Sequence, residues 1–328
     1  MCGFQGVKEE MEQVGRLRTM EEWTKTAEDM MKAGTLFVLL TGGEPLLYPH
    51  FRELYQKLRE LGMIITINTN GTLIDEAWAD FFAENKPRRI NITLYGASNE
   101  TYERLCHYPG GFDKAVNGIR LLRERNIDVK VNGSLAKANV DDRMKIIELG
   151  ESLDAPVRID TYMYPSVRER NHAYNNQARL DPEMAAKARV EVLQREMGEE
   201  VFAQYRKIQL DEAENTPEGE AVPGQMACRA GKSSFVVNWQ GEMRSCVVLD
   251  KPSIPLKDVE FEEAWELTKK ETESLRISAR CSSCKLRKVC NTCVAAAIAE
   301  TGKADGVPEY LCRYTEATVR YLKETSKK

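Results

Sequence analysis

Cysteine is concentrated in the last part of this chain, at spacings that suit metal binding. Of nine cysteines in 328 residues, seven lie between residues 228 and 312, and four of these occur in CSSCKLRKVCNTC, residues 281–293. Two CxxC pairs could wrap one zinc ion and close a small domain that is poor in apolar residues. Iron–sulfur clusters also use three or four thiolates each. Seven thiols are too many for one zinc ion and one short of two all-cysteine sites.

A second candidate site is the segment TGGEP, residues 41–45, which follows the apolar run TLFVLL. Its glycines let the backbone approach a ligand closely, and ligands of parallel α/β sheets bind at such strand ends. A tight turn between a strand and a helix is the alternative interpretation. Comparable polar residues end the following three apolar segments, although ordinary turn chemistry would also place them there: Thr69, Asn70, Thr93 and Asn132.

Alternating helical and strand patterns predict the framework that positions these residues. The first helix is indicated by a capping box from Thr19 to Glu22 and ends at Gly34. Five apolar strands start near residues 35, 63, 89, 127 and 157, with amphipathic helices between them. Such alternation predicts an α/β fold with a parallel sheet made of right-handed crossovers.

Composition shifts divide the rest of the chain. Residues 165–221 have polar ends rich in Pro and Gly around a predicted helix from about 182 to 210, which indicates a helical connector. Residues 222–328 contain the cysteines, two predicted strands around Gln240-Gly241 and a C-terminal helix from about residue 313. The predicted domains are therefore residues 1–164, 165–221 and 222–328.

Charge and hydropathy narrow the class of protein. The net charge of -4 provides no basic surface for nucleic acid. No apolar run approaches the roughly 20 residues that span a bilayer, and the N-terminus lacks a signal-like segment. We therefore predict a cytoplasmic protein that binds neither nucleic acid nor membrane. Disulfides are rare in that compartment, and Cys106, in YERLCHYPGG, is expected in a loop or in packing.

The order of the cysteines resembles the SPASM domain, the twin-cluster extension of radical SAM enzymes. Cys228 is followed after twelve residues by Gly241 and after four more by Cys246, then by the CxxC ladder and finally Cys312. TGGEP in turn resembles the GGEP motif of the radical SAM core. One departure is CNTC, which has two residues between its cysteines where the family usually has three.

The resemblance implies a fold and a set of cofactors. The core would be a partial (β/α)6 barrel, and its CxxxCxxC loop and first strand would lie mostly upstream, leaving only Cys2 of the loop. Two auxiliary 4Fe-4S clusters are implied, one held by Cys281, Cys284, Cys290 and Cys312 and one by Cys228, Cys246 and Cys293. The second cluster would need a ligand other than cysteine. Cys2 would belong to a third cluster, which binds S-adenosylmethionine, and the implied contacts to that cofactor are Gly42, Gly43, Glu44, Pro45, Thr69, Asn70, Thr93 and Asn132.

The implied function is that of an oxidoreductase. Such an enzyme takes an electron from an external donor, cleaves S-adenosylmethionine to a 5′-deoxyadenosyl radical and abstracts hydrogen from its substrate. A peptide or protein substrate is expected, as for the peptide maturases of the family. Cys2 alone is not expected to hold the third cluster, so the chain as printed is not expected to cleave S-adenosylmethionine. The alternative interpretation of a lone Cys2 is an exposed thiol. The alternative is a non-catalytic iron–sulfur or zinc protein that binds partners or transfers electrons.

Overall fold

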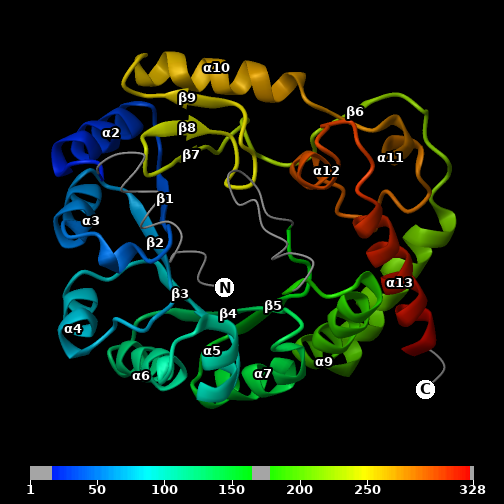
Figure 1. Ribbon diagram of the computed structural model, residues 1–328, viewed down its shortest axis with the longest axis horizontal. Coiled ribbons are helices and arrows are strands. Elements are labelled where there is room, and N and C mark those ends of the chain that lie inside the picture. The colour runs from blue at the N-terminus through cyan, green and yellow to red at the C-terminus, as the bar shows by residue number, and fades with distance from the viewer. Residues whose placement is uncertain (1–16, 165–177, 326–328) are drawn as a thin grey trace. The chain divides into compact units, whose positions relative to one another are not determined.

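The structure, a computed structural model, describes residues 17–164 and 178–325 (Figure 1). Contacts divide the chain into two compact units, unit 1 before and including Asp160 and unit 2 from Thr161 onward. No helix among the described residues has the length and apolar character needed to cross a bilayer.

Unit 1 contains the predicted parallel sheet. Its strand order follows the chain, and every neighbouring pair is parallel. The five strands are β1 Phe37–Leu40, β2 Ile64–Thr69, β3 Arg89–Leu94, β4 Val129–Ser134 and β5 Val157–Asp160. The prediction of an α/β fold with a parallel sheet is confirmed.

The helices of unit 1 alternate with these strands and lie outside the curve that the strands follow (Figure 1). The first of them begins with the predicted capping box, in which Thr19 and Glu22 each bond the other's backbone N–H. The helical elements are α2 Met20–Lys32, η1 Pro45–Leu47, α3 Phe51–Glu60, α4 Glu76–Glu84, α5 Asn99–Cys106, α6 Gly111–Glu124, η2 Val140–Asp142 and α7 Arg143–Ser152. Cys106 is the last residue of α5 and does not lie in a loop.

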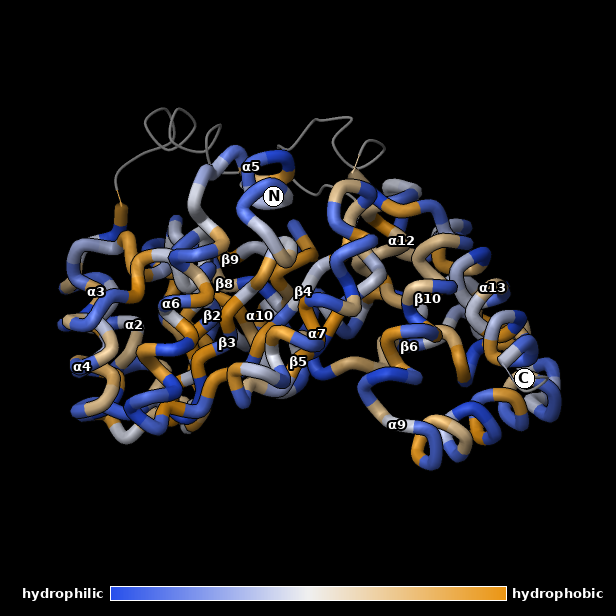
Figure 2. The backbone as a smooth tube through the Cα atoms, turned by 90° about the horizontal axis from the view of Figure 1, so that it is seen from below, coloured by the Kyte–Doolittle hydropathy of each residue, from blue (hydrophilic) through white to orange (hydrophobic). Residues whose placement is uncertain are grey.

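Period-two alternation determines which face of the sheet is buried. Along β2, β3 and β4 every second residue is buried, including Ile67, Ile92 and Val131. The apolar stretches of Figure 2 therefore run along these strands. The intervening residues are only half-buried and include Asn91 and Asn132, so the opposite face of the sheet is partly polar.

Asn139 joins the loops that follow β3 and β4. Its side chain is 1% exposed, accepts a hydrogen bond from Ala136 N–H at 2.7 Å and donates to the carbonyls of Tyr95 and Ser134 at 2.9 and 3.0 Å. Both loops leave the carboxyl ends of adjacent strands, so Asn139 holds this end of the sheet together.

Replacing Asn139 with alanine is expected to lower the free energy of unfolding by about 2–3 kcal/mol, because three buried bonds to main-chain groups are lost. Urea unfolding followed by circular dichroism measures the change. Glu84→Ala, at an exposed position of α4, is the control. Equal stability of the two variants would show that the Asn139 side chain does not stabilise the carboxyl end of the sheet.

Unit 2 is built on two helices that pack together. The first is α9 Pro182–Asn215, which is kinked at Gly198 (φ 71°, ψ 169°), and the second is α13 Glu309–Thr325. A small core fills their contact: Val190, Leu193, Phe202 and Leu322. The helix predicted from about 182 and the C-terminal helix are both present.

The rest of unit 2 consists of short elements. One antiparallel sheet contains β7 Val236–Val237, β8 Glu242–Arg244 and β9 Ser253–Pro255, and a second pairs β6 Gly224–Gln225 with β10 Arg276–Ile277. The remaining helices are α10 Phe261–Ser274, α11 Ala279–Ser283 and α12 Val294–Thr301. Six of the seven cysteines of unit 2 lie in or beside these short elements, and Cys312 lies in α13.

Candidate functional site

The TGGEP turn connects β1 to η1 and directs its glutamate into unit 1. Glu44 is the N-cap of η1, where its carboxylate accepts from Leu46 N–H at 3.2 Å, and Pro45 occupies the first helical position. Gly42 has φ +156°, a value that side-chain-bearing residues rarely adopt. Glycine is therefore required at that point of the turn.

Glu44 also binds the loop that follows β2. Its carboxylate accepts from Thr69 Oγ1 and from Asn70 N–H, both at 2.7 Å. Burial raises the pKa of Glu44, while these hydrogen bonds and that from Leu46 N–H partly oppose the shift. One carboxylate thus holds two strand-end loops together.

Thr69 and Asn70, predicted to contact the cofactor, have partners within the chain. Thr69 is 4% exposed and also accepts from Gly71 N–H at 3.1 Å. Asn70 Oδ1 accepts from the backbone N–H and the hydroxyl of Thr72, at 2.8 and 2.7 Å. These bonds form the turn chemistry that the sequence left open as an alternative.

Thr93 and Asn132 lie on the partly polar face of the sheet. They are register partners across β3 and β4 and both are half-buried. On the same face, Asn91 donates to Asn68 at 2.7 Å across β2 and β3. Four polar side chains from three strands therefore share one face, near the carboxyl ends that carry Glu44 and Asn139.

Four cysteines of unit 2 form a first thiol set. Burial raises the pKa of the Cys290 thiol, hydrogen bonds with Thr315 and Thr292 oppose this, and the neighbouring thiols of Cys281 and Cys284 raise it further. Burial likewise raises the pKa of Cys312 to about 12, with added contributions from Glu309, Cys290 and Cys281. We use the name first thiol set for the four cysteines that the resemblance assigns to one cluster: Cys281, Cys284, Cys290 and Cys312.

The loop between Cys284 and Cys290 is held by hydrogen bonds and an ion pair. Leu286 N–H donates to Cys284 Sγ at 3.4 Å, so the thiol lies within a turn of its own backbone. Lys288 pairs with Glu212 of α9 at 2.7 Å, and Arg287 donates to the carbonyl of Pro217 at 2.6 Å. Hydrogen bonds of this kind orient thiolates and tune bound iron–sulfur clusters.

A second thiol set consists of Cys228, Cys246 and Cys293. Burial is the largest cause that raises the pKa of the Tyr164 phenol. The neighbouring thiol of Cys293 raises this pKa further, and those of Cys246 and Cys228 do so more weakly. Val248 N–H donates to Cys246 Sγ at 3.4 Å, in the same arrangement as at Cys284. The set lies beside a small core formed by Met226, Leu249, Val294 and Ala295.

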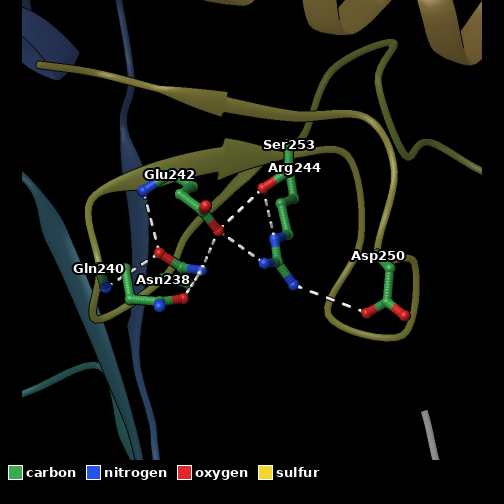
Figure 3. Close-up of polar contacts among 6 residues, drawn as sticks. All are labelled: Asn238, Gln240, Glu242, Arg244, Asp250 and Ser253. Carbon is green, nitrogen blue, oxygen red and sulfur yellow. Dashed lines mark hydrogen bonds and ion pairs between the residues drawn. The ribbon is translucent and has the colours of Figure 1, made fainter. Parts of the chain in front are cut away.

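A buried polar network supports the strand that leads to Cys246. Arg244 of β8, whose side chain is 8% exposed, pairs with Glu242 at 2.6 Å and donates to Ser253 Oγ at 2.9 Å (Figure 3). Burial alone would raise the pKa of Glu242, but hydrogen bonds from Arg244, Ser253 and Asn238 lower it on balance. Cys246 follows Arg244 by two residues, so this network lies beside the second thiol set in the sequence.

Aromatic residues hold the segment that contains Tyr164. Arg179 pairs with Glu300 at 3.0 Å, both side chains being 11% exposed, and lies 3.3 Å from the ring centroid of Tyr310. Tyr162 donates to the same Glu300 carboxylate at 3.2 Å. The sequence offered no spacing signal for this cluster.

The predicted metal ligands thus divide into three groups. Cys2 lies outside the described residues, and the other seven make up the two thiol sets that the resemblance implies. In residues 17–164 and 178–325, no three His, Cys, Asp or Glu side chains form a site for a metal ion as they stand. The donors nevertheless suit iron–sulfur clusters, because each set gathers thiols from several elements and includes a thiol hydrogen-bonded by a backbone N–H.

Comparisons with known proteins agree with this architecture. Residues 1–150 match the family model of the Radical SAM superfamily. The AdoMet-dependent heme synthase of Methanosarcina barkeri is 24% identical over 297 residues, which cover 87% of this chain and 84% of the synthase. The PqqA peptide cyclase of Rhodopseudomonas palustris is 26% identical over 176 residues, which cover 54% of this chain and 46% of the cyclase.

A solved structure shares the fold over most of the chain. Native anSMEcpe with bound AdoMet and Kp18Cys peptide aligns with a TM-score of 0.67 at 19% identity, covering 95% of this chain and 91% of that one.

Proposed function

We propose that this chain, whose residues 1–150 match the Radical SAM superfamily, cleaves S-adenosylmethionine reductively and modifies a peptide or protein substrate. The observation that carries the proposal is the joining of the TGGEP turn to the next strand-end loop by Glu44. This contact fixes a set of backbone and side-chain groups at the edge of the sheet where parallel α/β folds bind ligands.

The residues of this chain would bind and orient S-adenosylmethionine. The cofactor supplies the 5′-deoxyadenosyl radical when it is cleaved. The TGGEP backbone would lie against it, and the Glu44 carboxylate would accept from its amino group while keeping the loop bonds. Thr93 and Asn132, on the partly polar face of the sheet, would contact the part of the cofactor that extends away from the TGGEP turn. An external donor would supply the electron.

Unit 2 would hold two 4Fe-4S clusters, one at each thiol set. Their thiols would lose protons on binding iron, so cluster binding should release protons. All eight cysteines among the described residues are free of disulfides. A reducing compartment suits such thiols, and we place the reaction in the cytoplasm.

A peptide substrate is supported by two of the similar proteins, one named a peptide cyclase and the other solved with a peptide. A tetrapyrrole substrate is the second candidate, because the similarity to a heme synthase covers 87% of this chain. Nucleic acid is not expected as the substrate, because a chain with a net charge of -4 has no excess of basic residues to bind phosphates.

The test uses the natural protein, as its gene encodes it, after anaerobic reconstitution with iron and sulfide. With dithionite and S-adenosylmethionine we expect release of 5′-deoxyadenosine, measured by mass spectrometry. No release from cluster-loaded protein would contradict the proposal and favour a non-catalytic iron–sulfur protein.

Isotope transfer distinguishes the two substrate classes. The abstracted hydrogen ends in 5′-deoxyadenosine, so the assay is repeated with deuterated peptides and, separately, with a deuterated iron porphyrin. Deuterium arriving from the peptides is the expected result. Deuterium arriving only from the porphyrin would replace the peptide assignment with the tetrapyrrole one.

A further inference from the structure

Strand β5, the last in the sheet of unit 1, presents a charged pair on one of its faces. Val157 and Ile159 face the helices: Ile159 is 0% exposed, and a Cβ atom added at Gly150 of α7 would lie 2.0 Å from Val157 Cγ2. Because side chains alternate along a strand, Arg158 and Asp160 lie on the opposite face. Both are exposed, with 61% and 51% of their side chains accessible to solvent.

Arg158 continues the row of polar residues that begins at Thr93. Asn132 is the register partner of Thr93 on one side and of Arg158 on the other. Thr93 and Asn132 are two of the residues proposed above to contact S-adenosylmethionine. Neighbouring strands lie about 4.8 Å apart, so Arg158 is one strand spacing beyond Asn132. A substrate that lies beside the bound cofactor on this face would be within reach of the long Arg158 side chain.

The guanidinium group of Arg158 is oriented but only partly used. Its Nε donates to Asp160 Oδ1 at 3.2 Å, which is its only ion pair among the described residues. The fork formed by its two Nη atoms is therefore left for another acceptor. Two parallel N–H donors match the two oxygens of a carboxylate, the group that arginine binds with two hydrogen bonds.

A second arginine on the same face of the sheet provides a contrast. Arg89 begins β3, at the amino end of the strands, and directs both Nε and Nη2 at Asp128 Oδ2, each at 2.8 Å. Its ion pair resembles that of Arg158 in composition and exposure, but it lies at the end of the sheet opposite to the one where parallel α/β folds bind ligands. Arg89 is therefore a matched control for Arg158.

We propose that Arg158 binds a carboxylate of the substrate and so selects substrates with an acidic group near the carbon that loses hydrogen. This contact rests on the proposed function, because it requires the substrate to lie beside the cofactor. Reacting atoms must approach to about 3.5 Å. The acidic side chains and the C-terminus of a peptide supply such a carboxylate, and the propionates of a porphyrin supply the same group in the second substrate class.

Retention of peptides on the immobilised natural protein, with S-adenosylmethionine present, tests this contact without turnover. One peptide pool contains aspartate, glutamate and free C-termini, and the other contains asparagine, glutamine and amidated C-termini in their place. We expect the acidic pool to be retained about tenfold more strongly, because a hydrogen-bonded charge pair is gained. Arg158→Gln should abolish this preference, Arg158→Lys should keep part of it, and Arg89→Gln should keep it in full.

A tetrapyrrole arm identifies the other source of the carboxylate. An iron porphyrin with free propionates is compared with its dimethyl ester on the same variants. Retention of the free acid that depends on Arg158, without a preference between the peptide pools, would assign the contact to a tetrapyrrole. If the wild type showed no preference in either comparison, or if Arg158→Gln kept the preference of the wild type, the inference would be wrong.

Affinity for S-adenosylmethionine, measured by equilibrium dialysis, distinguishes a substrate contact from a cofactor contact. It should be equal in the wild type and Arg158→Gln. A tenfold loss in the variant would make Arg158 a ligand of the cofactor's own carboxylate and would overturn the inference. Circular dichroism checks that the variant folds, as expected because exposed ion pairs contribute little to stability.

Release of 5′-deoxyadenosine separates failure of this inference from failure of the proposed function. Preference for the acidic pool without any release would support the carboxylate contact and refute the proposed reaction. Release without preference for a carboxylate in either comparison would support the reaction and refute the role of Arg158.

Discussion

Replacing Cys284 with alanine is expected to remove one iron–sulfur cluster and to lower the melting temperature of unit 2 by roughly 8–16 °C. Loss of a structural metal belongs to the mutations that cost more than about 4 kcal/mol, and each kcal/mol shifts melting by about 2–4 °C in a unit of this size. The effect is large because, apart from α13, the elements beside the two thiol sets are strands of two or three residues and helices of five to eight, which bury little apolar surface. Unit 2 therefore depends on its metals more than unit 1 does.

Iron and sulfide analysis with calorimetry measures the change. The reconstituted wild type should contain about eight irons in unit 2, and Cys284→Ala about four. Cys106→Ala is the matched control, since that thiol ends α5 of unit 1 and belongs to neither set. Finding one or two zinc ions and no sulfide in the wild type would refute the cluster assignment.

Replacing Glu44 with glutamine is expected to reduce affinity for S-adenosylmethionine at least tenfold and to destabilise unit 1 by about 1–3 kcal/mol. The carboxylate accepts from Leu46 N–H, Thr69 Oγ1 and Asn70 N–H. A glutamine offers a single acceptor oxygen, so its amide group must turn a donor toward at least one of these donors. The TGGEP turn would then separate from the loop after β2.

Equilibrium dialysis with labelled S-adenosylmethionine measures affinity, and urea unfolding measures stability. Glu53→Gln is the control, because that carboxylate lies at the exposed start of α3, where it contacts His50 Nδ1 at 3.2 Å. If Glu44→Gln lost stability but bound the cofactor normally, Glu44 would be a bracing residue only, and the cofactor site would lie elsewhere.

The framework of unit 1 was predictable because each element has a repeated local signal. Alternation of buried residues along β2 to β4 and the capping box at Thr19 are properties of a few neighbouring residues. The short strands of unit 2 offer no such signal. A predicted pair around Gln240-Gly241 appears as β7 and β8, whereas β6, β9 and β10 were not predicted. Strands of two or three residues are too brief to show a period.

The candidate sites were predicted as residue types but not as contacts. Spacing identified the cysteines and TGGEP, since metal ligands and glycine turns require particular separations along the chain. It could not show that Glu44 binds Thr69, nor that Asn139 joins two loops, because both contacts depend on the order of strands in the sheet.

The two thiol sets are interleaved along the chain, since Cys293 of the second lies between Cys290 and Cys312 of the first. With a cluster at each, neither could be assembled from an independent stretch of polypeptide. Filling one would shorten the loops that must close to form the other and so reduce the entropy lost in the second step. Assembly would then be cooperative, and in a cell short of iron the protein would exist chiefly as fully loaded and empty molecules, with few in between.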